Sequence, residues 1–479
     1  MRNPTIVSIL ALGILCGAVT VKPASPEEPG IVRSDASDQE SVHLTVYNQN
    51  RALVNEVRNV NFPGGMVNLW FQDVASQIMP ETVAIKGITG AEFTVREQNY
   101  EFDLLSPQKL LEKYLDRDVD LVRLDRDEDR TVEKRTRAHL LSTNNGTVWQ
   151  IGDRIVVNPP YAYLEFPQLP ANLYAKPTLV WLLDAKKGSA RVQTTYLTQN
   201  ITWKADYVFT LDEKDTGGDM IGWVTLTNNS GATYTHATLK LIAGDVNVVQ
   251  DREPMMRYAQ KGVLAESAPQ FEEKSFFEYH MYTLQRPATL NDRQQKQIEL
   301  LHADEFGVEK QFIARGQRWY YSQRIGDVQK PKVEVAVKVM NSEKNGLGLP
   351  LPKGTVRVYK RDTDGSSQFI GEDTIDHTPR DESIYLTLGN AFDLVTERRQ
   401  TDYRVISDCV RESAFEIKVR NHKKEPATLR LIEPVGGEWE MLNHSHPFIK
   451  MDAFTLEFPV PVNPDEEVVV TYRVRLKYC

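Results

Sequence analysis

Residues 201–211 read ITWKADYVFTL, and this stretch decides the fold class. One set of its alternate positions is apolar and consists of Trp203, Ala205, Tyr207, Phe209 and Leu211. The other set is mostly polar, and a side-chain period of two is typical of a β-strand with one buried face. The stretch therefore predicts a strand whose rings of Trp203, Tyr207 and Phe209 lie in a core.

A second stretch, GWVTLTNNSGATYTHATLKLIAGD at 222–245, contains two alternating runs separated by the turn sequence NNSG. Turn residues between alternating runs indicate consecutive strands. Together the two stretches predict an extended antiparallel sheet with one face buried. Similar runs recur along the chain, so we expect an all-β protein with several antiparallel β domains.

One helix is expected in the whole chain. Ser106 can cap it, Pro107 suits its first position, and KLLEKYL extends it to about Leu115. About five short strands follow, and a short helix with five strands is typical of a small SH3-like barrel.

The length of 479 residues predicts two to four domains. Changes of composition and turn signals favour the following organisation: a signal peptide at 1–24, a flexible leader at 25–40, an N-terminal β region at 41–105, the short helix plus SH3-like barrel at 106–165, a central antiparallel β region at 166–400 with a mobile loop at 251–275, and an immunoglobulin-like β-sandwich at 401–479.

The N-terminus predicts export. Arg2 precedes an uncharged apolar stretch at 6–21, and small residues follow it, as in a secretory signal. An uncleaved anchor is the alternative, and no later stretch is long and apolar enough to span a membrane. The expected location is periplasmic or extracellular. The net charge of −9, from 57 basic and 66 acidic residues, argues against a nucleic-acid partner.

Removal of the signal leaves two cysteines, Cys409 and Cys479. Cys409 lies where the C-terminal sandwich begins, and Cys479 follows its last strand. The first and last strands of immunoglobulin-like sandwiches often run side by side, so a disulfide between these residues is expected. Two free thiols are the alternative.

Trp319 and Tyr321 are the candidate ligand-stacking surface, because alternate residues of a strand share one face. The alternative is one core ring and one lone surface ring. His444 and His446 could hold a metal, but no third ligand is evident nearby. The sequence contains no catalytic or cofactor-binding motif, and no catalytic, cofactor or metal residue is predicted.

Several stretches resemble the bacterial exported proteins of domain of unknown function 4139, some of which are labelled mucoidy-inhibitor-like. The matching stretches include VYNQNRALV (46–54), KPTLVWLL (176–183), ITWKADYV (201–208), GWVTLTNNSGATYTHATLKLIAGDVN (222–247), LPLPKGTVRVYKRD (349–362) and FDLVTERRQTDY (392–403). The resemblance implies an envelope or secreted β protein and supplies no catalytic residues.

These observations predict a non-catalytic exported binding or structural protein of the bacterial cell envelope. Its partner would be an envelope protein or polysaccharide that the sequence does not identify. The alternative is a hydrolase acting on envelope polysaccharide or peptide, with carboxylates that meet only in the folded chain.

Overall fold

The computed structural model describes residues 29–479 apart from 102, 128–129, 171–172 and 245–269. About 64% of the chain is strand and about 5% is helix, which confirms the all-β prediction. The predicted signal peptide lies outside the described residues, as does the predicted mobile loop up to residue 269. The end of that loop is a strand, because β17 begins at Phe271.

The N-terminal strands and some of the central strands form two sheets. A four-stranded sheet has the order β1 (Gly30–Ser34), β4 (Gly65–Gln72), β12 (Thr178–Ala185) and β6 (Phe93–Glu101). An eight-stranded sheet contains β17 (Phe271–Phe276), β18 (Tyr279–Leu284), β16 (Tyr234–Ala243), β2 (Gln39–Tyr47), β3 (Arg51–Phe62), β13 (Gly188–Gln199) and β5 (Ala84–Gly90), with β19 (Ala288–Leu290) beside β16.

Two expectations about this part are wrong. Described residues of the predicted flexible leader are ordered, because β1 pairs in parallel with β4 and Arg58 donates to the Ser34 carbonyl at 3.0 Å. The predicted boundary between an N-terminal and a central region also does not separate two units. Strand β3 pairs with β13 along its whole length, and β2 pairs with β16.

The segment between β6 and β12 forms a separate small module. It contains α1 (Pro107–Lys113), β7 (Asp118–Asp127), β8 (Arg130–Ser142), β9 (Val148–Ile151), β10 (Arg154–Val157) and β11 (Tyr163–Glu165). The Ser106 hydroxyl accepts from the Lys109 amide at 3.1 Å, which confirms the predicted cap. The five strands form one sheet over a core that includes Tyr114, Leu140 and Trp149.

The largest sheet runs from the centre into the C-terminal region. Its order is β23 (Ser367–Ile375), β22 (Gly354–Arg361), β14 (Ile201–Leu211), β15 (Gly217–Asn228), β20 (Gln294–Arg315), β27 (Ala427–Pro434), β30 (Thr455–Val462) and β29 (Ile449–Lys450). Strand β21 (Glu334–Met340) pairs with β20, and β24 (Ser383–Asn390) pairs with β21. The 22 residues of β20 connect the two regions, because it pairs with β15 and then with β27.

The last sheet has the order β25 (Leu394–Val405), β26 (Val410–Asn421), β31 (Glu467–Lys477) and β28 (Glu438–His444). It shares a core with β27 and β30, in which Phe415, Phe458 and Tyr472 take part. The C-terminal strands therefore form two packed layers. The expected start at residue 401 falls inside β25, so the module begins at Leu394.

The stretch ITWKADYVFTL is strand β14, paired antiparallel with β15 from Ile201–Asn228 to Leu211–Gly218. Trp203, Tyr207 and Phe209 are buried, as predicted. The NNSG turn, however, does not close a hairpin. Strand β16 leaves for the eight-stranded sheet, and the Asn228 side chain holds this corner by donating to the carbonyls of Ala232 at 2.8 Å and Asn291 at 3.0 Å.

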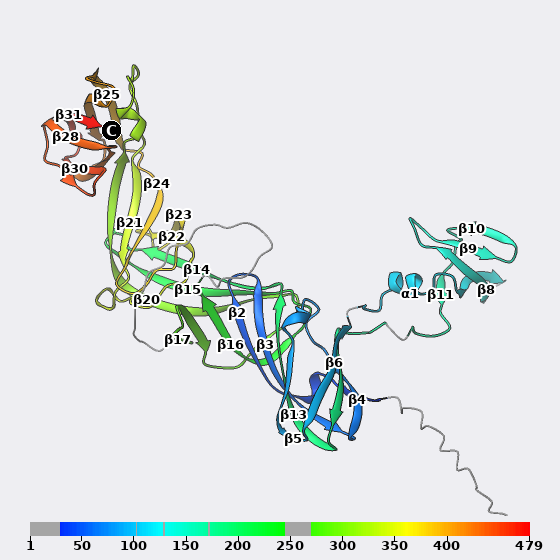
Figure 1. The fold of residues 1–479 in the computed structure, drawn as a ribbon. Coiled ribbons are helices and arrows are strands. Elements are labelled where there is room, and N and C mark those ends of the chain that lie inside the picture. Colours follow the sequence, from blue (N-terminus) through cyan, green and yellow to red (C-terminus); the bar gives the residue numbers. More distant parts are fainter. Residues whose placement is uncertain (1–28, 102, 128–129, 171–172, 245–269) are drawn as a thin grey trace, which may run out of the picture.

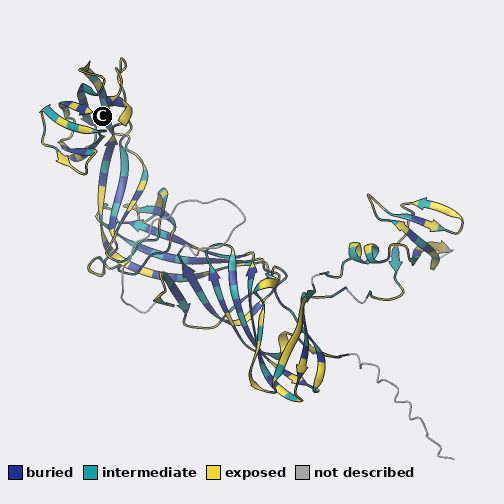
Figure 2. Ribbon diagram, in the orientation of Figure 1, coloured by how far each residue is buried: buried dark blue, intermediate teal, exposed yellow. Residues whose placement is uncertain are grey.

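Figure 1 shows an elongated molecule with the C-terminal strands at one end and the four-stranded sheet far from them. One large core extends across the four-stranded, eight-stranded and largest sheets, and Val54, Trp181, Tyr207 and Leu241 belong to it. Figure 2 shows buried and exposed positions alternating along many of the strands. Many of these strands therefore present one face to a core and the other to solvent.

Candidate functional site

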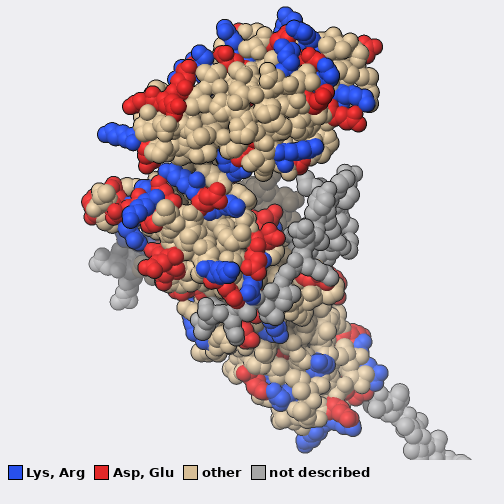
Figure 3. Space-filling view, turned by 90° about the vertical axis from the view of Figure 1, so that its left-hand side faces the viewer, with Lys and Arg blue, Asp and Glu red and all other residues tan. Residues whose placement is uncertain are grey.

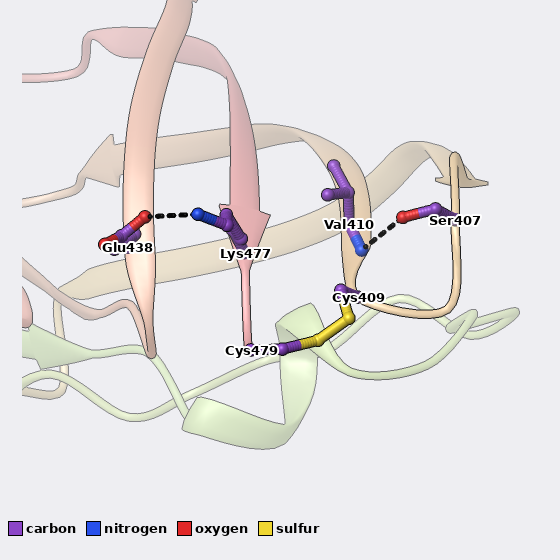
Figure 4. Close-up of a disulfide and its surroundings, with 6 residues drawn as sticks. All are labelled: Ser407, Cys409, Val410, Glu438, Lys477 and Cys479. Atoms are coloured by element: carbon purple, nitrogen blue, oxygen red, sulfur yellow. Dashed lines mark hydrogen bonds and ion pairs between the residues drawn. A yellow bond between two sulfur atoms is a disulfide. The ribbon is translucent and has the colours of Figure 1, made fainter.

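Cys409 and Cys479 form a disulfide with a Cα–Cα distance of 5.6 Å (Figure 4). The geometry follows from strand pairing, because Val410 at the start of β26 lies opposite Lys477 at the end of β31. The amide of Tyr478 also donates to the Cys409 carbonyl at 2.9 Å. The strand that follows Cys409, β26, and the last strand, β31, thus run side by side, as the expectation assumed.

Replacing both cysteines with serine is expected to lower the free energy of unfolding by about 2–4 kcal/mol. The bond closes a segment with a sequence separation of 70, and the chain-entropy model assigns roughly 4 kcal/mol to a loop of this length. Urea denaturation of oxidised wild type and of the double variant measures the difference. Two equivalents of alkylating reagent taken up by unfolded, non-reduced protein would show that the bond is absent.

Trp319 and Tyr321 do not form a two-ring surface. They lie in a 3-10 turn, η3 (Arg318–Tyr321), and not on a strand, so the alternation argument does not apply to them. The Trp319 side chain is 43% exposed, whereas Tyr321 is fully buried. This arrangement matches the alternative of one core ring and one surface ring.

The C-terminal histidines make local contacts. His444 Nδ1 lies 2.9 Å from the His446 carbonyl oxygen, and its ring meets Phe448 edge-on. Among the residues that the structure describes, no group of three or more His, Cys, Asp or Glu side chains is placed to hold a metal ion.

A charged cluster that the sequence did not indicate lies inside the C-terminal core. Arg398 on β25 forms an ion pair with Glu433 on β27, and both side chains are nearly inaccessible. The second Glu433 oxygen accepts from Tyr321 at 2.7 Å and from Tyr472 at 3.0 Å. Burial raises the pKa of both tyrosine hydroxyls, which therefore remain donors. Because this cluster is enclosed, we assign it to stability and not to binding.

A second cluster, in the small module, is partly exposed. The ring nitrogens of His139 on β8 lie 2.9 Å from Asp118 Oδ1 and 3.0 Å from Asp116 Oδ1. Hydrogen bonds to Asp116 and Asp118 raise the pKa of His139 above its ordinary value. Hydrogen bonds from His139 and Arg137 lower the pKa of Asp118.

An NMR titration is expected to show His139 with a pKa above the unfolded value of about 6.5. Protonated His139 therefore makes its full contribution to the stability of the fold below about pH 6.5. This contribution is lost as the pH rises through the pKa of His139 in the folded protein. The Asp118→Asn variant should bring the pKa of His139 down. A pKa at or below the ordinary value in the wild type would contradict the structure.

The outward face of β14 and its neighbours carries a connected polar network. We call it the polar face and define it as Lys204, Asp206, Trp223, Thr225, Gln297, Glu299, Arg357 and Glu372. Strand pairing places these side chains together, because Asp206 lies opposite Trp223, Lys204 opposite Thr225, and Trp223 opposite Glu299. The opposite face of the same strands supplies Trp203 and Tyr207 to the core.

Asp206 organises this face, although it is only 7% exposed. It accepts from Thr225 at 2.9 Å, from Lys204 at 3.1 Å and from Arg357 at 3.3 Å. Burial alone would raise the pKa of Asp206, but hydrogen bonds from Lys204 and Thr225 outweigh it and the pKa is lowered. Asp206 is therefore ionised at neutral pH and orients its neighbours.

The network continues outward to accessible side chains. Gln297 donates to the Thr225 hydroxyl at 3.2 Å, and Arg357 pairs with Glu372 at 3.2 Å. A hollow of about 510 Å³ adjoins the network where β22 begins and β23 ends. Its lining includes Lys204, Thr355 and Thr374.

Figure 3 shows a second feature, a broad face with few charged residues in the uppermost part of the molecule, with Lys, Arg, Asp and Glu around its rim. This part contains the C-terminal module (Figure 1). Ile449, Met451 and Phe454 of that module are about half exposed, at 52%, 50% and 48%.

Within the described part of the chain, no helix is both long and apolar enough to cross a membrane. No family model matches the chain. No curated protein matches it either.

Proposed function

We propose that this protein is a non-catalytic exported binding or structural protein of the bacterial cell envelope. The observation that carries the proposal is the polar face, where the partly exposed Trp223 lies beside an ordered hydrogen-bonding network on a rigid sheet. Sites for specific ligands commonly combine an aromatic surface with a few oriented polar groups. The resemblance to the exported proteins of domain of unknown function 4139 supports the same assignment.

The disulfide supports the proposed location. Disulfides such as Cys409–Cys479 persist in oxidising compartments and are rare in the cytosol. The apolar stretch at 6–21 favours the same route of export. We therefore propose that the mature chain lies in the periplasm or outside the cell.

To test this proposal, the full chain is expressed with a C-terminal tag in a bacterial host. We expect the mature protein outside the cytoplasm, without its first twenty or so residues, and retaining envelope material on affinity capture. Protein that begins at Met1, remains in the cytoplasm and captures no envelope component would contradict the proposal.

The hydrolase alternative predicts turnover instead of retention. Incubation of the purified mature chain with envelope polysaccharide and peptidoglycan, followed by assay of released reducing ends and peptides, separates the two. Catalytic release of either product would favour the hydrolase.

A further inference from the structure

We infer that the polar face is a binding site for a neutral saccharide, with Trp223 as the stacking surface. This inference rests on the proposed function and specifies its ligand class. The site comprises the polar face and the adjoining hollow of about 510 Å³. No other candidate in the described residues combines an accessible aromatic ring, oriented donors and acceptors, and a hollow.

The accessible groups match the two faces of a sugar ring. A pyranose has an apolar C–H face, which can pack on the indole of Trp223, and hydroxyls that each donate and accept hydrogen bonds. Lys204 and Arg357 can donate to such hydroxyls, and their side chains are 62% and 39% exposed. Glu372 can accept, with 54% side-chain exposure, and Gln297 can do both.

The network holds these groups in place before a ligand arrives. Lys204 and Arg357 share the carboxylate of Asp206, and Gln297 is held by Thr225, which also bonds to Asp206. Binding therefore costs less side-chain entropy than it would on a surface of unrestrained side chains. Asp206 is itself buried, so it acts as a positioning residue and not as a direct contact.

The charge on the polar face favours a neutral ligand. Its two cations, Lys204 and Arg357, are paired with Asp206 and Glu372, and Glu299 adds a third anion. A polyanion would meet no net positive charge there. A protein partner would need a larger apolar centre than a single tryptophan among polar groups offers.

The dimensions suit a short oligosaccharide. The polar face crosses five neighbouring strands in the order β20, β15, β14, β22 and β23. Four strand spacings correspond to about 19 Å. A chain laid across the strands would pass Gln297, Trp223 and Arg357 in turn and reach Glu372 at the far edge.

The test measures binding of defined oligosaccharides to the mature full chain by calorimetry. The probes are maltohexaose, cellohexaose and N-acetylchitohexaose, with hexagalacturonate as an anionic comparator. We expect at least one neutral probe to bind with a Kd below about 1 mM. The Trp223→Ala variant should weaken that binding at least about tenfold.

Two further variants separate recognition from folding. Trp223→Phe keeps an aromatic ring and should retain part of the affinity. Trp319→Ala removes a more exposed tryptophan from the C-terminal module and should leave Kd unchanged. Thermal unfolding of each variant, run in parallel, must match that of the wild type within about 2 °C for Kd values to be compared. If Trp223→Ala falls outside this range, Gln297→Ala replaces it as the test variant.

The inference is overturned if the wild type binds no neutral probe, prefers hexagalacturonate, or binds equally well after Trp223→Ala. Such a failure remains distinct from failure of the proposed function. If Trp223→Ala protein still captures the same envelope material as the wild type, only the saccharide assignment is wrong. If wild-type protein captures none and stays in the cytoplasm, the proposed function is wrong.

Discussion

Replacing Glu433 with alanine is expected to lower the free energy of unfolding by about 3–5 kcal/mol, because it leaves a buried charge without its partner. Arg398 is 3% exposed, and Glu433 is fully buried. The change would also remove the acceptor of the Tyr321 and Tyr472 hydroxyls. Urea denaturation followed by near-UV circular dichroism, which reports on the packed tyrosines, measures the loss.

Two controls test the reason for this loss. Glu438→Ala removes an exposed partner of Lys477 in the same module, where side-chain exposures are 80% and 53%, and should change stability by less than about 1 kcal/mol. Arg398→Met combined with Glu433→Leu removes both charges and should cost less than Glu433→Ala alone. A double variant as unstable as the single one would show that packing, and not the unpaired charge, dominates.

Replacing Phe209 with alanine is expected to cost a similar amount, about 3–5 kcal/mol, through lost burial and the cavity that remains. The Phe209 ring is fully buried and lies 5.1 Å from the Phe306 ring, centroid to centroid. A Cβ on Gly218 would come within 2.7 Å of the Phe209 ring, so the neighbouring strand leaves little space around it. Chemical denaturation at neutral pH measures the effect.

The matched control is Lys204→Ala on the same strand, which should change little, because that side chain lies on the outward face and is 62% exposed. Equal losses for the two variants would contradict the assignment of faces on β14. A small loss for Phe209→Ala would mean that the core relaxes around the missing ring, or that this end of the sheet is not packed as described.

Local features of the chain were predictable because their physical causes are local. The alternation in ITWKADYVFTL follows from the two-residue period of a strand, so the burial of Trp203 and Phe209 could be inferred from the sequence. The helix at 107–113 could be inferred in the same way, because Ser106 and Pro107 act on the neighbouring backbone. Neither inference required knowledge of strand partners.

Strand partners were decided only by the tertiary structure. The NNSG turn has the composition of a hairpin, yet β15 and β16 enter different sheets. Both strands have an alternating pattern, and any partner strand with one apolar face could pack beside either of them. The choice depends on contacts far apart in sequence, such as β16 with β2. Contacts between residues far apart in the sequence also decide the burial of Tyr321. Its hydroxyl forms hydrogen bonds with Glu433 and Tyr472 in the core.

The candidate site depends on both kinds of information. Alternation predicts that Lys204 and Asp206 lie on the face of the strand opposite the core, and the sequence by itself determined that this face is mostly polar. Only the tertiary structure brings Trp223, Gln297, Arg357 and Glu372 beside them, from strands as many as 168 positions away in the chain (372 against 204). A binding surface made by five strands is determined by their register, and register is a property of the folded sheet.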